Sequence, residues 1–217
     1  LPERRRERSG AEGAPLQAEE ERTDRTFTYR SAAPRAQMTL AWRQTRGSEY
    51  PERQKMIVLA KILEDRVFKK IRGEMGSTYA PSVTLQLAEH SPRYAFLLCS
   101  VETVPERSAE VRVAVKEIAR ALVERGVTEE EFERARAPFL AQQASEVRTN
   151  GYWLDLLVQA QSNPTRFQWW QQRTERLKAL TKTDLDEAAR NYLGVDQMSV
   201  FTIQPRNAVS GGQASAR

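Results

Sequence analysis

The sequence is poor in the residues that most often hold metals or form cross-links. Its 217 residues include one histidine, His90, and one cysteine, Cys99. Zinc sites draw three or four ligands mostly from Cys and His, so none can be built here without several carboxylates or a second chain. A disulfide within the chain and a Cys-x-x-Cys redox pair are both excluded. We therefore expect no metal bound by this chain.

Long apolar runs are also missing. The longest lie at residues 56–60 and 95–99, whereas a membrane-spanning helix needs roughly 18 apolar residues. We therefore expect no membrane span. The length suits one domain, and an apolar content of 40% is workable for a globular core.

Charge of neither sign dominates. The chain has 34 basic and 29 acidic residues, a net charge of +5, and 27 of the basic residues are Arg. They are interleaved with glutamates, as in Glu117/Arg120, Glu131/Arg134 and Glu175/Arg176, which is typical of solvated helix faces. A nucleic-acid surface would show a cationic run with aromatics between the charges, so we expect no nucleic-acid partner. Nucleic-acid binding, suggested by the basic pI alone, stays as a weaker alternative that salt-dependent oligonucleotide retention would support.

Both ends of the chain differ from its centre. Residues 1–25 hold six Arg, six Glu, one Asp and no aromatic, and cannot bury enough apolar area to offset their ordering entropy. We interpret them as a disordered linker or an arm lying on a partner. They lack a starting Met and an apolar core region, so a signal peptide is not predicted. Residues 206–217, with Ser-Gly-Gly, indicate a flexible tail.

The chain between, residues 26–205, has the pattern of one folded domain. Period-two alternation predicts strands, and apolar residues at helical spacing predict helices. The expected order is strands at 26–29 and 36–45, a helix at 51–75, a strand hairpin at 79–87 and 93–101, a helix from Pro105 to Gly126, a helix capped by Thr128 with Glu131, a short aromatic helix after Asn150-Gly151, a helix around 167–180, a helix capped by Thr183, and a closing strand at 198–203.

Consecutive strands in the middle exclude a doubly wound parallel fold. They favour an α+β domain with a mostly antiparallel sheet and helices packed on one face. The second half holds more helices than crossovers require, so helix–helix packing should form part of the core.

The junction between the long helix and the hairpin carries the most informative residues. Arg72 falls in the last turn of the helix, Gly76 turns the chain, and Tyr79 begins the next strand. Local rules alone give ordinary roles, because a cation near a helix C-terminus is favoured by the dipole and Tyr is common in strands.

The spacing Arg-x-x-x-Gly-x-x-Tyr, here Arg72, Gly76 and Tyr79, resembles a signature in the C-terminal half of insulinase/pitrilysin-type zinc metallopeptidases. The segment 150–154, Asn-Gly-Tyr-Trp-Leu, and the closing 183–193 helix followed by a strand are similar to later parts of the same domain. The resemblance covers about residues 26–205 and implies a metallopeptidase-like, or mitochondrial processing peptidase-like, fold. The wording Gly-Ser-Thr-Tyr-Ala-Pro resembles the large bacterial members, which implies a periplasmic location.

The resemblance also implies that two domains have different roles. One domain of that family carries a His-x-x-Glu-His zinc motif and a distant Glu ligand, and a homologous domain faces it across a cavity. By resemblance, Arg72 and Tyr79 bind the peptide substrate, this chain holds no catalytic residue, and zinc belongs to a homologous partner domain or subunit. A guanidinium and a phenol aimed at substrate carbonyls would stabilise charge that develops during zinc-assisted hydrolysis.

Two departures qualify this expectation. The chain has no His-x-x-Glu-His, so we expect no peptidase activity from it alone, and position 73 is Gly where many members have Glu. Glu74 could replace that carboxylate or be a surface residue.

An inactive scaffold or assembly subunit of the same fold stays open as the alternative. In that case Arg72 would be a structural cap buried with Tyr79 in the helix layer rather than facing an open surface.

Three further residue types have plain interpretations. His90 is expected in a solvent-exposed turn, and Cys99 as a small buried hydrophobe. Trp153 is expected in the core, whereas Trp169 and Trp170 must point differently, which places one of them at the surface or an interface.

Overall fold

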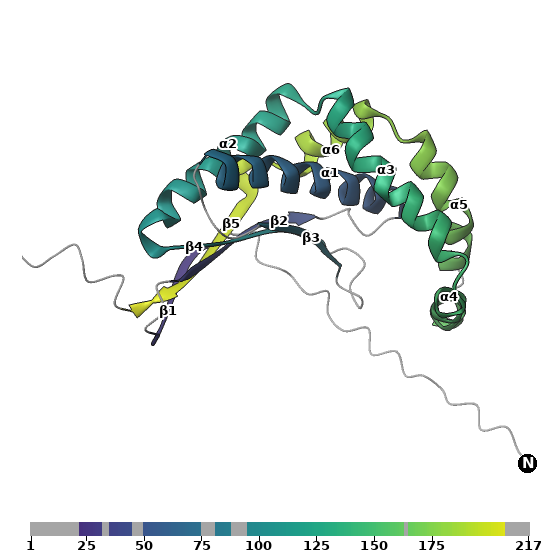
Figure 1. Ribbon diagram of the computed structural model, residues 1–217, viewed down its shortest axis with the longest axis horizontal. Coiled ribbons are helices and arrows are strands. Elements are labelled where there is room, and N and C mark those ends of the chain that lie inside the picture. The colour runs from purple at the N-terminus through teal and green to yellow at the C-terminus, as the bar shows by residue number, and fades with distance from the viewer. Residues whose placement is uncertain are drawn as a thin grey trace, which may run out of the picture.

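The computed structural model describes residues 22–31, 35–44, 50–74, 81–87, 95–162 and 165–206 (Figure 1). The strands are β1 (Asp24–Tyr29), β2 (Ala36–Gln44), β3 (Ser82–Leu87), β4 (Ala95–Thr103) and β5 (Met198–Pro205). The α-helices are α1 (Tyr50–Phe68), α2 (Ser108–Arg125), α3 (Glu129–Glu146), α4 (Asn150–Ser162), α5 (Thr165–Ala179) and α6 (Lys182–Tyr192). Shorter turns are η1 (Lys69–Glu74), η2 (Pro105–Arg107) and η3 (Val195–Gln197).

The five strands form one sheet in the order β1-β5-β2-β4-β3. The β2/β4, β2/β5 and β3/β4 pairs are antiparallel, and the β1/β5 pair is parallel. The predicted hairpin and the predicted mostly antiparallel α+β fold are therefore confirmed. The last strand is inserted between the first two, so both ends of the folded region meet at one side of the sheet. β1 begins at Asp24, two residues before its predicted start.

Helices cover one face of the sheet and leave the other open, as Figure 1 shows. Alternation within β2 sets this arrangement, because Met38, Leu40 and Trp42 are at most 1% exposed and face the helices. Thr39 lies on the opposite face, where its hydroxyl oxygen is 3.1 Å from that of Ser100 on β4. The period-two pattern of the sequence thus separates a buried face from an open one.

Helix α1 forms the centre of the core. Its apolar residues recur at helical spacing, and Met56, Leu59, Leu63 and Val67 are completely buried. They pack in one cluster with sheet residues such as Leu97 and with residues from α2 and α6. Burial of each such side chain contributes roughly 1.5–3 kcal/mol relative to exposure, so this helix contributes strongly to the stability of the domain.

The predicted cap of α3 is confirmed, and that of α6 is wrong. Thr128 accepts a hydrogen bond from the Glu131 amide and the Glu131 carboxylate accepts one from the Thr128 amide. At α6 the cap is Thr181 with Asp184, two residues before the predicted Thr183. The sequence holds overlapping Thr-x-x-Asp patterns, 181–184 and 183–186. The second is not used as a cap because Asp186 accepts a hydrogen bond from the distant Val127 amide, at 2.8 Å.

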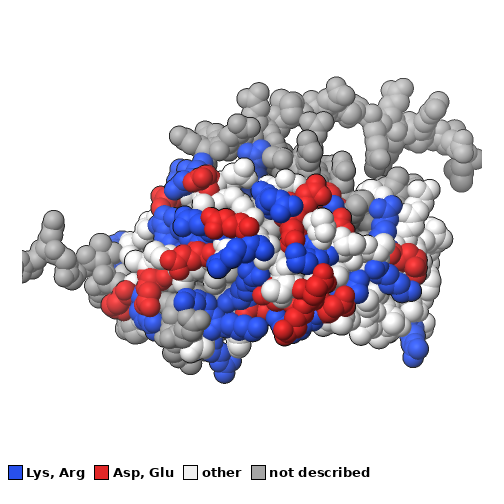
Figure 2. Space-filling view, turned by 90° about the horizontal axis from the view of Figure 1, so that it is seen from above, with Lys and Arg blue, Asp and Glu red and all other residues white. Residues whose placement is uncertain are grey.

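Charges are mixed over the helix layer. Seen from above, Lys and Arg side chains lie among Asp and Glu side chains (Figure 2). Local pairs such as Arg107–Glu110 and Lys178–Glu175 give the spacing expected of solvated helix faces. Glu131, however, pairs with the distant Arg66.

Within the described ranges, no helix is both long and apolar enough to cross a membrane.

Candidate functional site

The predicted site begins where α1 changes its winding. After Phe68 the chain continues into η1, six residues of π-helix that contain Arg72. π-Helical turns are rare and frequently occur at functional sites. Ile71 within this turn is completely buried, so it anchors the widened turn to the core while the neighbouring Arg72 faces outward.

Arg72 is exposed at the surface. Its guanidinium lies over the Phe68 ring, with the central carbon 5.3 Å from the ring centroid, and Phe68 is itself 37% exposed. This is a cation–π contact at the surface. The contact holds the planar guanidinium group in place through its face, so it does not use the N–H donors at the edge of that group. Arg72 therefore lies at the surface and is not buried in the helix layer.

The other half of the predicted pair is not described. Tyr79, Gly76 and His90 lie outside the described residues, as does the side chain of Glu74. The connection is nevertheless fixed at its far end. The Val83 amide donates to the Glu64 carboxylate at 3.3 Å, which places the start of the edge strand β3 beside α1. β3 starts at Ser82, three residues after the predicted start at Tyr79.

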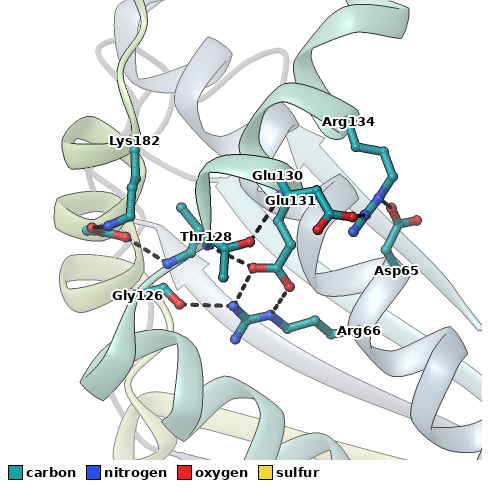
Figure 3. A network of polar contacts seen from close by, with 10 residues as sticks. Asp65, Arg66, Gly126, Thr128, Glu130, Glu131, Arg134 and Lys182 are labelled. Atoms are coloured by element: carbon teal, nitrogen blue, oxygen red, sulfur yellow. Dashed lines mark hydrogen bonds and ion pairs between the residues drawn. The ribbon is translucent and has the colours of Figure 1, made fainter.

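A half-buried ion pair fixes α1 one turn before η1 (Figure 3). Arg66 donates through Nε and Nη2 to the two Glu131 carboxylate oxygens, at 2.8 and 2.7 Å. Nη2 also donates to the Gly126 carbonyl at 2.9 Å. Bidentate pairs of this kind are short, strong and directional. The pair joins α1 to the connection between α2 and α3.

The same contacts set the protonation of Glu131. Burial by itself would raise the pKa of this carboxyl, but hydrogen bonds from Arg66 and from the Thr128 amide outweigh it and lower the pKa to about 2. Glu131 is therefore ionised at neutral pH. Two further links lie beside it: Asp186 accepts from the Val127 amide and from Lys182, and Arg134 contacts both Asp65 and Glu130.

The open face of the sheet is largely uncharged at its centre. Strand register places Ala41 beside Leu98 and Thr39 beside Ser100 on this face. Phe96, which is 36% exposed, follows in the same column of β4. An ion pair between Arg35 and Glu102 lies at the margin, with side chains that are 58% and 37% exposed. Such a surface can accept an uncharged backbone or apolar side chains.

An aromatic cluster that was not predicted from the sequence lies between α4 and α5. The Trp153 and Trp170 ring centroids are 4.9 Å apart, and that of Tyr152 lies 5.6 Å from Trp170. Arg173 lies over the Tyr152 ring at 4.7 Å. The predicted core position of Trp153 is wrong, because it is 40% exposed. Its indole N–H donates to the Val147 carbonyl at 2.8 Å, which fixes the ring at the rim of the cluster. Trp169 and Trp170 are both half-buried.

Cys99 has no accessible chemistry. It is completely buried on β4, as predicted, and burial raises the pKa of its thiol to about 12. Within the part of the chain that the structure describes, no group of three or more His, Cys, Asp and Glu residues could hold a metal ion.

These features can be compared with known proteins. The family model described as "Peptidase M16 inactive domain" matches residues 6–139. The chain belongs to the M16 peptidase family. This confirms the resemblance found in the sequence and identifies the chain as carrying an inactive domain of that family. The matched region ends within α3 and includes the turn that carries Arg72.

The M16 relatives are longer than this chain. The chloroplastic stromal processing peptidase of rice (Oryza sativa subsp. indica) is 30% identical over 147 residues, which are 66% of this chain and 12% of that enzyme. The periplasmic protease PqqL of Escherichia coli superposes with a TM-score of 0.74 at 18% identity, covering 89% of this chain and 22% of that chain. The M16 inactive domain of Pseudomonas fluorescens gives a TM-score of 0.69 at 16% identity, covering 85% and 43%.

Proposed function

We propose that this chain is the substrate-binding, zinc-free part of an M16 peptidase. Its Arg72 and Tyr79 would hold the peptide while a homologous domain or subunit holds zinc. The exposed guanidinium of Arg72, held on the Phe68 ring at the end of a core helix, is the observation that carries the proposal. A scaffold role needs no such presentation, because a structural cation at a helix end interacts with its own carbonyl groups.

The chemistry assigned to Arg72 is donation to a substrate carbonyl oxygen. The Phe68 ring leaves the N–H fork free to point at a peptide, and α1 makes the turn rigid through its buried face. Fixed donors aimed at developing negative charge lower the barrier because they need no reorganisation during the reaction. The zinc of the partner domain would supply Lewis-acid activation of water and carbonyl. The open sheet face next to β3 would receive the rest of the peptide.

The test is turnover of the complete enzyme, with the zinc-bearing domain present. We expect Arg72→Ala and Tyr79→Phe each to lower kcat/KM on the order of 10²–10³-fold, as for the loss of one oxyanion donor. Arg72→Lys should recover little, because an ammonium lacks the planar fork. Arg125→Ala is the matched control, since Arg125 is exposed in the last turn of α2. It should leave kcat/KM unchanged.

The kinetic pattern also separates two kinds of contact. Equal losses in kcat and kcat/KM mean that the donor acts in the transition state, whereas a rise in KM alone means uniform substrate binding. If both Arg72→Ala and Tyr79→Phe keep the wild-type kcat/KM, the substrate role is wrong and the scaffold alternative takes its place.

We further propose a periplasmic location. The similar PqqL fold belongs to a periplasmic protease, and the sequence Gly-Ser-Thr-Tyr-Ala-Pro resembles the large bacterial members. Cell fractionation of the native protein against a cytoplasmic marker tests this, and recovery with the cytoplasmic marker would contradict it.

A further inference from the structure

Helix α4 exposes a continuous apolar surface. Leu154, Leu157 and Val158 are 64%, 56% and 58% exposed, and Trp153 is 40% exposed. At about 100° per residue these four side chains fall on one side of the helix; they are named here the α4 stripe. Asp155 is the only charged residue of α4, and it lies outside the stripe.

The stripe is held rigidly. Tyr152 and Leu156, on the opposite side of α4, face α5, where Leu156 is 8% exposed. Trp153 is fixed by its hydrogen bond to Val147 and by its contact with Trp170. α5 is in turn tied to the core helix, because the Gln54 side chain donates to the Arg173 carbonyl at 2.8 Å. In Figure 1, α4 lies beyond the end of the helix layer, on the side toward which the open sheet face looks.

A single exposed apolar residue of the helix layer, Val113, gives a useful contrast. Val113 of α2 is 53% exposed, but Glu110, Arg112 and Glu117 lie within one turn of it. Single exposed apolar side chains among charges are ordinary, whereas a contiguous, uncharged group marks an interaction site.

We propose that the α4 stripe is the docking surface for a helix of a second M16 domain, on the same polypeptide or on another subunit. This rests on the proposed function, which requires such a domain. This chain spans 43% of the Pseudomonas fluorescens chain and 22% of the PqqL chain. In those relatives the same fold is therefore joined to at least as much additional chain, which is room for a second domain.

The form of the stripe favours a helix as its occupant. The backbone groups of α4 are already paired within the helix, so the stripe cannot bind an extended peptide through main-chain hydrogen bonds. Its exposed residues follow i, i+3, i+4 spacing, which suits ridges-into-grooves packing. Gly151 lies one turn before Leu154, and a Cβ built there meets no atom within 4 Å. A second helix can approach closely at that point.

The test uses thiol accessibility in the complete enzyme. The single native cysteine, Cys99, is silent because it is buried and burial raises its pKa to about 12. Val158→Cys places a thiol in the stripe, and Val113→Cys places one at a matched exposure on α2. We expect maleimide to label the V158C thiol at least 10-fold more slowly than the V113C thiol. Equal labelling rates would overturn the proposal.

Cross-linking identifies what covers the stripe. A maleimide–benzophenone reagent is attached to V158C after brief unfolding, and the refolded enzyme is irradiated and digested for mass spectrometry. The proposal predicts cross-links to a helix of another M16 domain. Cross-links to a second copy of this chain, to residues 1–21 of this chain, or to added peptide substrate overturn it, and so does the absence of any cross-link.

This result is independent of the kinetics of Arg72. A protected stripe with unchanged Arg72→Ala kinetics would retain the docking surface and remove the substrate role. A freely labelled stripe with impaired Arg72→Ala kinetics would remove the docking surface and retain the substrate role.

Discussion

Arg66 of α1 and Glu131 of α3 form a bidentate ion pair across 65 positions of sequence, and the same guanidinium holds the Gly126 carbonyl. Their side chains are only 20% and 16% exposed. The pair connects the core helix to the turn between α2 and α3, and it lies six residues before Arg72. The turn that presents Arg72 is therefore preceded by an electrostatic contact at Arg66 and anchored by the buried Ile71.

The pH dependence of stability should reveal this pair. The pKa of Glu131 is lowered from 4.5 to about 2 in the folded chain. A carboxyl with a depressed folded pKa stabilises the fold above its unfolded pKa, and this contribution is lost as pH falls through the folded value. Glu131→Gln should therefore lower the free energy of unfolding at pH 7 by up to about 3 kcal/mol. The difference from wild type should shrink between pH 4.5 and pH 2.

Urea unfolding at pH 7, 5 and 3 measures this difference. Glu133→Gln is the control, because Glu133 pairs with Arg136 but is 57% exposed, and exposed pairs contribute at most about 1 kcal/mol. A Glu131→Gln penalty that is the same at pH 3 and pH 7 would contradict the assignment.

Local patterns in the sequence predicted most of the fold. Strand β2 and helices such as α2 and α6 carry one clear period, because each has one buried face. The order of consecutive strands and helices then left a single layered arrangement. Arg72 could be predicted as a site residue only because its spacing to Gly76 and Tyr79 resembles a family signature.

The features that could not be predicted from the sequence depend on contacts between residues far apart in the chain. The partner of Glu131 is Arg66, not the nearby Arg134, and no local rule selects a residue 65 positions away. An amphipathic helix predicts a core position for Trp153, but α4 packs mainly on α5 and leaves one side exposed. The π-helical winding of η1 has no sequence signal that we can identify. The aromatic pairs at 152–153 and 169–170 were the available sign of the α4–α5 cluster.

The cap of α6 gives a direct comparison of two neighbouring threonines. Thr181 accepts from the Asp184 amide, and the Asp184 carboxylate accepts from the Thr181 amide. Thr181→Ala should lower the free energy of unfolding by about 1 kcal/mol, the usual cost of losing a cap. Thr183→Ala, an exposed position inside the same helix, should change it by less than about 0.5 kcal/mol. Thermal unfolding of the two variants shows which threonine caps the helix. A larger loss of stability in Thr183→Ala than in Thr181→Ala would mean that Thr183 is the cap.

Two glycines should respond to alanine with opposite signs. Gly126 has a φ of 72°, and a Cβ there would lie 2.7 Å from the Asp186 Cγ. Asp186 cannot move away freely, because it accepts hydrogen bonds from Val127 and Lys182. Gly126→Ala therefore combines backbone strain with the loss of a contact between α6 and the α2–α3 turn. We expect a loss of about 1–3 kcal/mol in the free energy of unfolding.

Gly151 is the matched comparison. It lies within α4 with no atom near its missing Cβ, so Gly151→Ala should stabilise the helix by up to about 1 kcal/mol. Urea unfolding of both variants at one pH measures the two changes side by side. A Gly126→Ala variant as stable as wild type would mean that Asp186 yields to the added methyl group. In that case the Val127 amide should exchange its hydrogen faster in the variant, because its acceptor has moved.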